Sequence, residues 1–203
     1  MNIKINSHSS IQIDDNIYFD PFNTTSGMPV ARIIFITHPH YDHFSPTDIS
    51  RVADKNTIIV TTKDNTEAEM MPHSKIIYVS PYDEFEIDDI FVKVLPAYNK
   101  DKKFHPKENN WVGYKLTIDD ETYIVAGDTD ATDELANEKT DVLILPIGGT
   151  YTMTAEEAAK LANKMMPKLV VPSHYNAIVG DKNDEAKFVS LLNPKIKCQI
   201  LID

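Results

Sequence analysis

The sequence predicts an α/β protein built from sheets that are covered by helices. Two patterns carry this prediction. The first is a repeated Ile-Asp-Asp turn at residues 13–15, 87–89 and 118–120, and the second is a series of short apolar runs separated by helix-forming segments. Hairpins combined with helix-separated strands are typical of layered α/β folds. The 203 residues show no break in composition, which predicts one domain over residues 1–203.

Each Ile-Asp-Asp repeat has strand-forming residues on both sides, as in IQIDDNIYF, FEIDDIFVKV and LTIDDETYIV. Aspartate tolerates turn conformations and accepts hydrogen bonds from the amides of a turn. The three repeats therefore predict three hairpins between antiparallel strands. We interpret the repeat as architectural.

Apolar runs predict the remaining strands, and segments with helical periodicity predict the helices. The predicted strands are Ile33–Thr37, Thr57–Thr61, Ile76–Val79, Val142–Pro146 and Leu169–Pro172. The predicted helices lie around Thr47–Asp54, Thr66–Met71, Thr132–Asn137, Thr154–Met166 and Asp184–Leu192. The clearest helix is Thr154–Met166, because Thr154 and Glu157 have the spacing of a capping box and Pro167 ends the run.

The composition argues against several classes of protein. A net charge of −11 disfavours non-specific nucleic-acid binding, which depends on clusters of lysine and arginine. No apolar run approaches the roughly 20 residues of a membrane helix, and the N-terminus lacks the apolar segment of a secretory signal. The single cysteine, Cys198, rules out an internal disulfide and fits a reducing compartment. We expect a cytoplasmic protein with no membrane or nucleic-acid partner.

The segment Thr37–Phe44, THPHYDHF, places three of the seven histidines and one aspartate within six residues. Neutral imidazoles are common zinc ligands, and catalytic metal sites keep one position open for water. On an extended loop, His38 and His40 point to the same side, while Asp42 and His43 can reach a second ion. The loop could supply about half of the ligands of a two-metal site.

Two further candidate ligands follow strands elsewhere in the chain. Asp128 comes after the strand-forming run 124–126 and a glycine, and His174 comes after the run 170–173. Taken alone, such an aspartate is usually a helix cap, and a single histidine is usually an ordinary surface or core residue. The histidine-rich segment makes a ligand role the better explanation for both.

These motifs resemble those of the metallo-β-lactamase-fold hydrolases. The matching motifs are YFDPF at 18–22, HPHYDH at 38–43, GDT at 127–129, LPIGGTYTM at 145–153 and PSH at 172–174. The fourth motif is most similar to the branch that includes ascorbate-6-phosphate lactonases and broadly described metal-dependent hydrolases. The resemblance spans about His8 to Tyr175. It implies an αββα four-layer sandwich, with two mixed sheets flanked by helices and metal ions at one edge.

The resemblance also implies which residues bind metal. It implies two divalent ions, with Zn²⁺ expected and Mn²⁺ or Fe as alternatives. His38 and His40 would hold the first ion. The remaining expected ligands belong to the second ion or to both: Asp42, His43 and His174 for the second, and Asp128 as the bridge.

One position departs from the family pattern. A third histidine for the first ion is expected after the strand-like run VKVLPAYN, but residue 99 at its end is asparagine, a poor zinc ligand. We predict that His105, six residues later, replaces it. The alternatives are a weaker first site or one filled by an oxygen-preferring ion such as Mn²⁺. Asn99 itself is a candidate contact to a metal ligand or to the substrate.

Two residues are expected near the site with less direct roles. Asp20 would accept a hydrogen bond from a ligand imidazole and fix its orientation, with a turn cap before Pro21 as the alternative. His8 lies where related proteins often have an early histidine near the site, and an exposed histidine at a strand end is the alternative.

The expected chemistry is metal-dependent hydrolysis. Two ions would lower the pKa of a shared water toward about 7, for attack on a carbonyl or phosphoryl centre. Asp42 would orient the nucleophile and accept its proton. A turn at Gly148–Thr150 would either bind an anion through its N–H groups or serve as a simple glycine turn.

We favour a small, anionic substrate: a phosphate ester, a phosphodiester or a lactone. The alternatives are a nuclease of the same fold, which the acidic charge disfavours, and a catalytically weakened metal-binding or regulatory protein.

Overall fold

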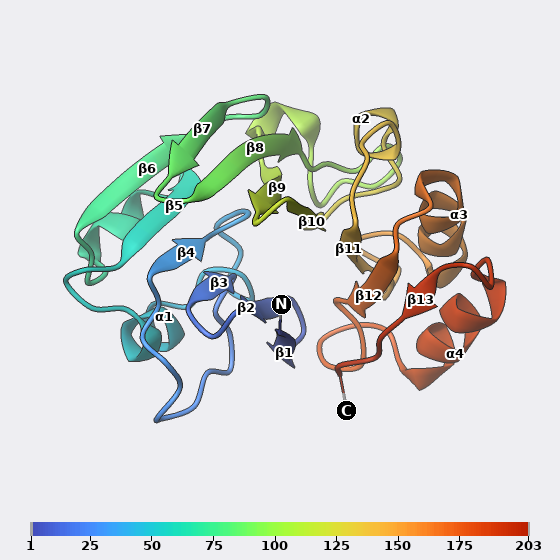
Figure 1. The fold of residues 1–203 in the computed structure, drawn as a ribbon, viewed down its shortest axis with the longest axis horizontal. Coiled ribbons are helices and arrows are strands. Elements are labelled where there is room, and N and C mark those ends of the chain that lie inside the picture. The colour runs from blue at the N-terminus through green and yellow to red at the C-terminus, as the bar shows by residue number, and fades with distance from the viewer. Residues whose placement is uncertain (1, 203) are drawn as a thin grey trace. The chain divides into compact units, whose positions relative to one another are not determined.

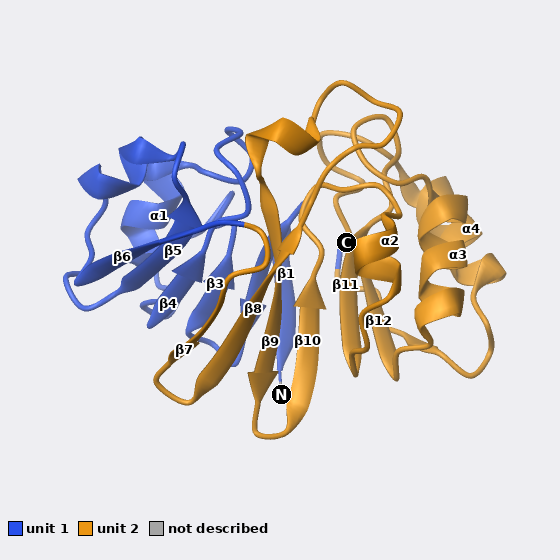
Figure 2. Ribbon diagram, turned by 90° about the horizontal axis from the view of Figure 1, so that it is seen from above, with its two compact units in different colours: residues 1–80, 202 blue, residues 81–201, 203 orange. Residues whose placement is uncertain are grey.

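The computed structural model describes residues 2–202, whose contacts divide the chain into two compact units. The first unit comprises residues 2–80 together with Ile202, and the second comprises residues 81–201 (Figures 1 and 2). Each unit contains one mixed β-sheet, so the two halves of the chain each build a sheet with its own helices.

The sheet of the first unit has six strands, arranged in the order in which they occur along the chain. The first three strands pair antiparallel, and the pairing is parallel from the third strand onward. The strands are β1 (Ile3–Ser7), β2 (Ser10–Ile13), β3 (Ile17–Phe19), β4 (Ile33–Phe35), β5 (Ile58–Thr62) and β6 (Lys75–Val79). Parallel neighbours need a crossover, and two of these crossovers contain α1 (Pro46–Val52) and the 3₁₀-helix η1 (Thr66–Met70).

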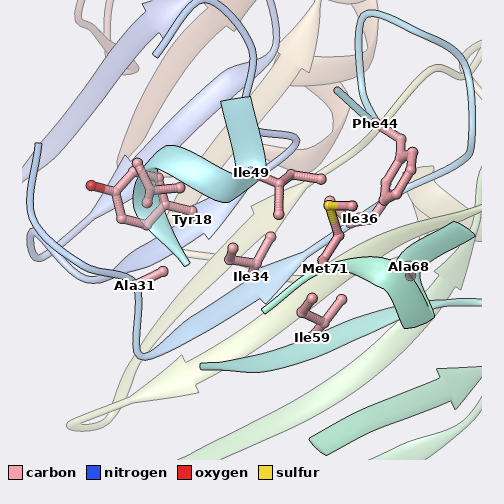
Figure 3. Close-up of a cluster of buried hydrophobic side chains, with 10 residues drawn as sticks. Tyr18, Ala31, Ile34, Ile36, Phe44, Ile49, Ile59, Ala68 and Met71 are labelled. Carbon is pink, nitrogen blue, oxygen red and sulfur yellow. The ribbon is translucent and has the colours of Figure 1, made fainter. Parts of the chain in front are cut away.

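Helix α1 packs on this sheet through a cluster of buried apolar side chains (Figure 3). Ile49 of α1 meets Ile34 of β4 and Ile59 of β5, and all three are fully buried. Burying a side chain of this size contributes roughly 1.5–3 kcal/mol. This packing holds the end of β4 in place, and the histidine-rich loop begins there.

The sheet of the second unit has seven strands in the order β13-β12-β11-β10-β9-β8-β7. Strands β10 to β13 pair parallel, whereas β7 to β10 pair antiparallel. The strands are β7 (Glu84–Ile87), β8 (Ile90–Pro96), β9 (Val112–Ile118), β10 (Glu121–Val125), β11 (Val142–Pro146), β12 (Leu169–Ser173) and β13 (Lys197–Cys198). The helices are η2 (Lys107–Asn109), α2 (Asp133–Ala136), α3 (Ala155–Met165) and α4 (Lys182–Leu191).

Helix α3 begins with the capping box that its sequence predicts. The Thr154 hydroxyl accepts a hydrogen bond from the Glu157 N–H, and the Glu157 carboxylate accepts one from the Thr154 N–H at 2.8 Å. Ala158, Leu161 and Ala162 form its buried face, and Met166 ends it in the left-handed conformation. Local sequence therefore specifies both ends of this helix.

The three Ile-Asp-Asp repeats form the predicted hairpins. They connect β2 to β3, β7 to β8 and β9 to β10, each pair antiparallel. In the last hairpin Asp119 and Asp120 have φ of 47° and 64°, the left-handed region that two-residue hairpin turns require. Aspartate reaches this region more readily than most residues, which explains its use at these turns.

The only cysteine lies in β13, at the edge of the second sheet, and is half-buried. Burial and the nearby Glu185 carboxylate raise the pKa of the Cys198 thiol to about 11. The same carboxylate accepts a hydrogen bond from the Tyr175 hydroxyl at 2.6 Å. No helix within residues 2–202 is long and apolar enough to cross a membrane.

In the first unit, Asp48 ties α1 to the long connection between β3 and β4. Its carboxylate accepts hydrogen bonds from the Thr24 N–H at 2.9 Å, the Thr24 hydroxyl at 3.0 Å and the Ser45 hydroxyl at 2.6 Å. Arg51 donates a further bond at 2.7 Å. Burial raises the pKa of Asp48, but the hydrogen bonds from Ser45 and Thr24 outweigh it, so the net pKa is below the ordinary value.

We expect Asp48→Asn to lower the free energy of unfolding at pH 7 by about 1–3 kcal/mol, because one donor would then face an amide N–H. Since the folded pKa is depressed, the carboxylate stabilises the protein fully above its unfolded pKa, about 3.9, and loses this effect as the pH falls through the folded pKa. The difference between the two proteins in urea denaturation should therefore shrink below about pH 4. Glu67→Gln, an exposed charge in the same unit, is the matched control and should leave stability within about 0.5 kcal/mol.

Candidate metal centre

The histidine-rich loop begins where β4 leaves its sheet. The ladder ends at Phe35, whose carbonyl accepts a hydrogen bond from the Asp20 N–H at 3.0 Å. The predicted strand extended to Thr37, but Thr37 instead turns toward Asp20. Its N–H donates to Asp20 Oδ1 at 2.8 Å, and its hydroxyl donates to Asp20 Oδ2 at 2.7 Å. The loop is therefore fixed to the end of β3 at its first residue.

Asp20 also contacts the His43 ring, in the way expected of a carboxylate that orients a ligand imidazole. His43 Nδ1 lies 2.7 Å from Asp20 Oδ2, and both side chains are almost completely buried. Burial raises the pKa of Asp20, and the His43 ring and the Thr37 donors counteract that rise. Because a carboxylate only accepts hydrogen bonds, His43 Nδ1 carries a proton. In a neutral His43 ring the lone pair is then on Nε2.

The same reasoning applies to His38. Thr37 Oγ1 gives its proton to Asp20, so it accepts from His38 Nδ1, which is 3.0 Å away. His38 Nε2 therefore carries the lone pair in a neutral ring. It faces His40 Nδ1 at 2.9 Å. Two ring nitrogens of adjacent histidines thus face each other, as paired ligands of one ion would.

Asp42 faces two buried imidazoles. Its Oδ2 lies 3.3 Å from His8 Nε2 and 3.6 Å from His43 Nε2. One ligand atom from each of these three residues lies within 4.8 Å of the others, a spacing that a metal ion could span. His8 sits in the tight turn between β1 and β2 with φ of 53° and is fully buried, so the alternative of an exposed histidine is wrong.

In the second unit, Asp128 lies near two buried imidazoles. It follows β10 through Gly127, whose φ is 67°. Asp128 Oδ2 lies 3.0 Å from His174 Nε2 and 3.3 Å from His105 Nε2, and all three residues are buried. A carboxylate with two imidazole nitrogens is a common ligand set for a divalent ion.

His174 reaches Asp128 from the end of β12. It has a positive φ of 55°, and the loop after β11 packs directly against its carbonyl. A Cβ on Gly148 would lie 2.2 Å from that carbonyl oxygen, so only glycine fits there. The neighbouring Gly149 N–H donates to the Met153 carbonyl at 2.9 Å. This favours the simple glycine turn over the anion-binding alternative.

The structure brings Asn99 and His105 together and gives them different surroundings. His105 directs Nε2 toward Asp128, whereas the Asn99 side chain bonds to protein groups at both its oxygen and its nitrogen. Trp111 packs against the His105 ring, with centroids 5.6 Å apart.

Sequence reasoning missed several residues that hold these clusters. Thr37 and Asp130 are polar residues close in sequence to the predicted ligands His38 and Asp128. This closeness could have indicated that they contact the site. The Tyr151 carbonyl, which accepts from Asn99 at 2.9 Å, has no signal in the sequence, because any residue has a carbonyl group.

Comparison with known proteins agrees with these features. A family model described as a β-lactamase superfamily domain matches residues 2–174, and the chain belongs to this family. A UPF0173 metal-dependent hydrolase of Pyrococcus horikoshii is 31% identical over 98% of this chain and 95% of its own length. A UPF0173 metal-dependent hydrolase of Geobacillus thermodenitrificans is 30% identical over 97% of this chain and 95% of its own length. Within the superfamily, the chain is thus a member of the UPF0173 metal-dependent hydrolases.

Solved structures agree on the fold. A protein from Parabacteroides distasonis is 29% identical, with a TM-score of 0.85, and the match covers 99% of this chain and 93% of that chain. A metallo hydrolase from Ignicoccus hospitalis, 22% identical, has a TM-score of 0.75 over 98% of this chain and 94% of its own. The predicted metallo-β-lactamase fold with two mixed sheets flanked by helices is confirmed, as is the prediction of a metal-dependent hydrolase.

Replacing Asp20 tests the orientation of the loop histidines. Both Asp20 oxygens accept hydrogen bonds, so in Asp20→Asn an amide N–H must face a donor. We expect metal affinity to fall roughly 10–100-fold, measured by competition with a chelator, as found when groups that orient ligands are removed. Asp15→Asn, an exposed carboxylate at the β2–β3 turn, should leave affinity unchanged. Unchanged affinity in a folded Asp20→Asn protein would contradict the orienting role.

Proposed function

We propose that the protein hydrolyses a small anionic molecule, a phosphate ester, a phosphodiester or a lactone, with two divalent metal ions as cofactors. Lactones are included because of the resemblance to the ascorbate-6-phosphate lactonase branch. The observation that supports the proposal best is that His38, His43 and His105 each have Nδ1 beside a hydrogen-bond acceptor, which favours a lone pair on Nε2 when the ring is neutral.

The proposed ligands follow the family resemblance. We propose that one ion is held by His38, His40 and His105. The proposed ligands of the second ion are Asp42, His43 and His174, and Asp128 is shared by both. The donor set of imidazole nitrogens and carboxylate oxygens suits Zn²⁺, and Mn²⁺ or Fe are the alternatives.

The chemistry then divides between the metal and the chain. Bound divalent ions supply a lowered pKa for water and a positive charge that polarises a substrate oxygen. Asp42 is the proposed proton acceptor, since its Oδ2 lies among the imidazoles of His8 and His43. Asp20, through Thr37 and His43, keeps the loop rings in one orientation.

The net charge of −11 disfavours a nucleic-acid substrate and supports a small molecule over a polymer. A cytoplasmic location is part of the same proposal.

Metal analysis and a substrate panel test the proposal together. Metal-replete protein should contain close to two equivalents of metal by mass spectrometry, and less than half an equivalent would refute the two-metal site. Nitrophenyl phosphodiesters, phosphomonoesters and a series of lactones form the panel, with single-stranded RNA as the nuclease arm.

We expect His40→Ala to lower turnover of the best substrate by on the order of 10²-fold or more, because it removes a proposed ligand. His73→Ala is the control and should retain full activity, since His73 is not a proposed ligand and its Nδ1 bonds to the Met71 carbonyl at 2.6 Å. Metal binding without turnover of any panel member would favour the regulatory alternative.

A further inference from the structure

Asn99 occupies the position where the family pattern expects a metal-binding histidine, and its side chain is held by four hydrogen bonds. Its Nδ2 donates to Asp130 Oδ1 at 3.2 Å and to the Tyr151 carbonyl at 2.9 Å. Its Oδ1 accepts from the His105 N–H at 3.0 Å and lies 3.2 Å from His105 Nδ1. The residue is buried, so these bonds have little competition from water.

The chemistry of the partners fixes which way the Asn99 amide points. A carboxylate and a carbonyl can only accept hydrogen bonds, so the NH₂ group must face Asp130 and Tyr151. The oxygen must then face His105. The backbone agrees, because the His105 N–H can only donate and it points at this oxygen.

The amide orientation in turn fixes His105. Its Nδ1 has two neighbours, Asn99 Oδ1 and the Tyr151 carbonyl, both 3.2 Å away and both acceptors. Nε2 faces one acceptor, Asp128 Oδ2, at the longer distance of 3.3 Å. Because Nδ1 has two acceptors and Nε2 has one, the proton of a neutral ring is favoured on Nδ1, and the lone pair is then on Nε2.

Asp130, which accepts a hydrogen bond from Asn99, also binds the segment between Asn99 and His105. Its carboxylate accepts from the Lys100 N–H at 2.8 Å and from the Lys102 ammonium, both on the segment that carries His105. The Asn99 N–H donates to the His105 carbonyl at 2.8 Å and closes a loop that spans residues 99–105. The His105 segment is thereby fastened at its start, in its middle and at the histidine itself.

We infer that Asn99 is a positioning residue, which keeps His105 in the Nδ1–H tautomer and directs its Nε2 lone pair toward Asp128. Asn99 thus acts on the site by orienting His105, although asparagine is itself a poor zinc ligand. The binding of a metal ion by this lone pair rests on the proposed function. The assignment of the His105 tautomer is independent of that function.

The tautomer can be measured directly in metal-free protein. Long-range ¹H–¹⁵N correlation spectra distinguish a protonated ring nitrogen from one with a lone pair, and they use carbon-bound protons. In spectra of the neutral ring, His105 should show the Nδ1–H pattern. A His105→Gln protein assigns the signals. An Nε2–H pattern in the parent protein would overturn the inference, whether or not any variant folds.

Two substitutions separate the Asn99 oxygen from its amide nitrogen. Asn99→Ala removes the acceptor, so the His105 signals should move toward a mixture of tautomers and metal affinity should fall roughly 10–100-fold. Asn99→Asp keeps an acceptor oxygen beside His105 but places its second oxygen against the Asp130 carboxylate and the Tyr151 carbonyl. Provided the protein folds, it should preserve the Nδ1–H pattern. Asn109→Ala, an exposed asparagine of the neighbouring η2, is the matched control and should change neither measurement.

The outcomes distinguish this inference from the proposed function. An unchanged His105 tautomer in folded Asn99→Ala protein would refute the positioning role, even if metal affinity fell. A parent protein that binds no metal would refute the proposed metal centre, while the tautomer result would still decide whether Asn99 controls the ring.

Discussion

The site depends on the pairing of three buried imidazoles, those of His38, His43 and His105, with hydrogen-bond acceptors at Nδ1. Asp20 takes the proton of His43 Nδ1, and it takes the Thr37 proton so that Thr37 can accept from His38. In the second unit, Asn99 and a backbone carbonyl do the same for His105. Every one of these contacts leaves a basic nitrogen on the opposite side of the ring. Buried basic nitrogens and carboxylates are stable together when a cation compensates them.

The ends of the β-strands place several of these side chains. Several residues of the proposed site follow strand ends, because a residue that leaves the ladder can turn its side chain without loss of a strand hydrogen bond. Asp20 follows β3, Asp128 follows β10 and His174 follows β12. Asp20 and His174 have positive φ, an uncommon conformation for such residues that the surrounding contacts must maintain. Gly148 helps to maintain this conformation, because its lack of a side chain lets the loop after β11 pack against the His174 carbonyl.

The sequence was most informative where a feature is local. The Asp-Asp hairpins and the capped helix α3 each depend on a few consecutive residues, and these were predicted correctly. The end of β4 was predicted two residues too late, because the contact that draws Thr37 out of the sheet comes from Asp20, 17 positions earlier. Roles that depend on contacts between residues far apart in the sequence, such as the hydrogen bond between Asn99 and Asp130, could not be predicted from motif spacing. The prediction of a single domain stays a prediction, although the family model continues across the boundary between the two units.

The surroundings of Cys198 have a practical consequence. A thiol whose pKa is about 11 is almost entirely protonated at neutral pH, and the protonated form is a poor nucleophile. The native chain should therefore react slowly with maleimides and resist mild oxidation. A cysteine introduced at an exposed hairpin tip would then be modified selectively, so a spectroscopic label could be attached without first removing the native residue.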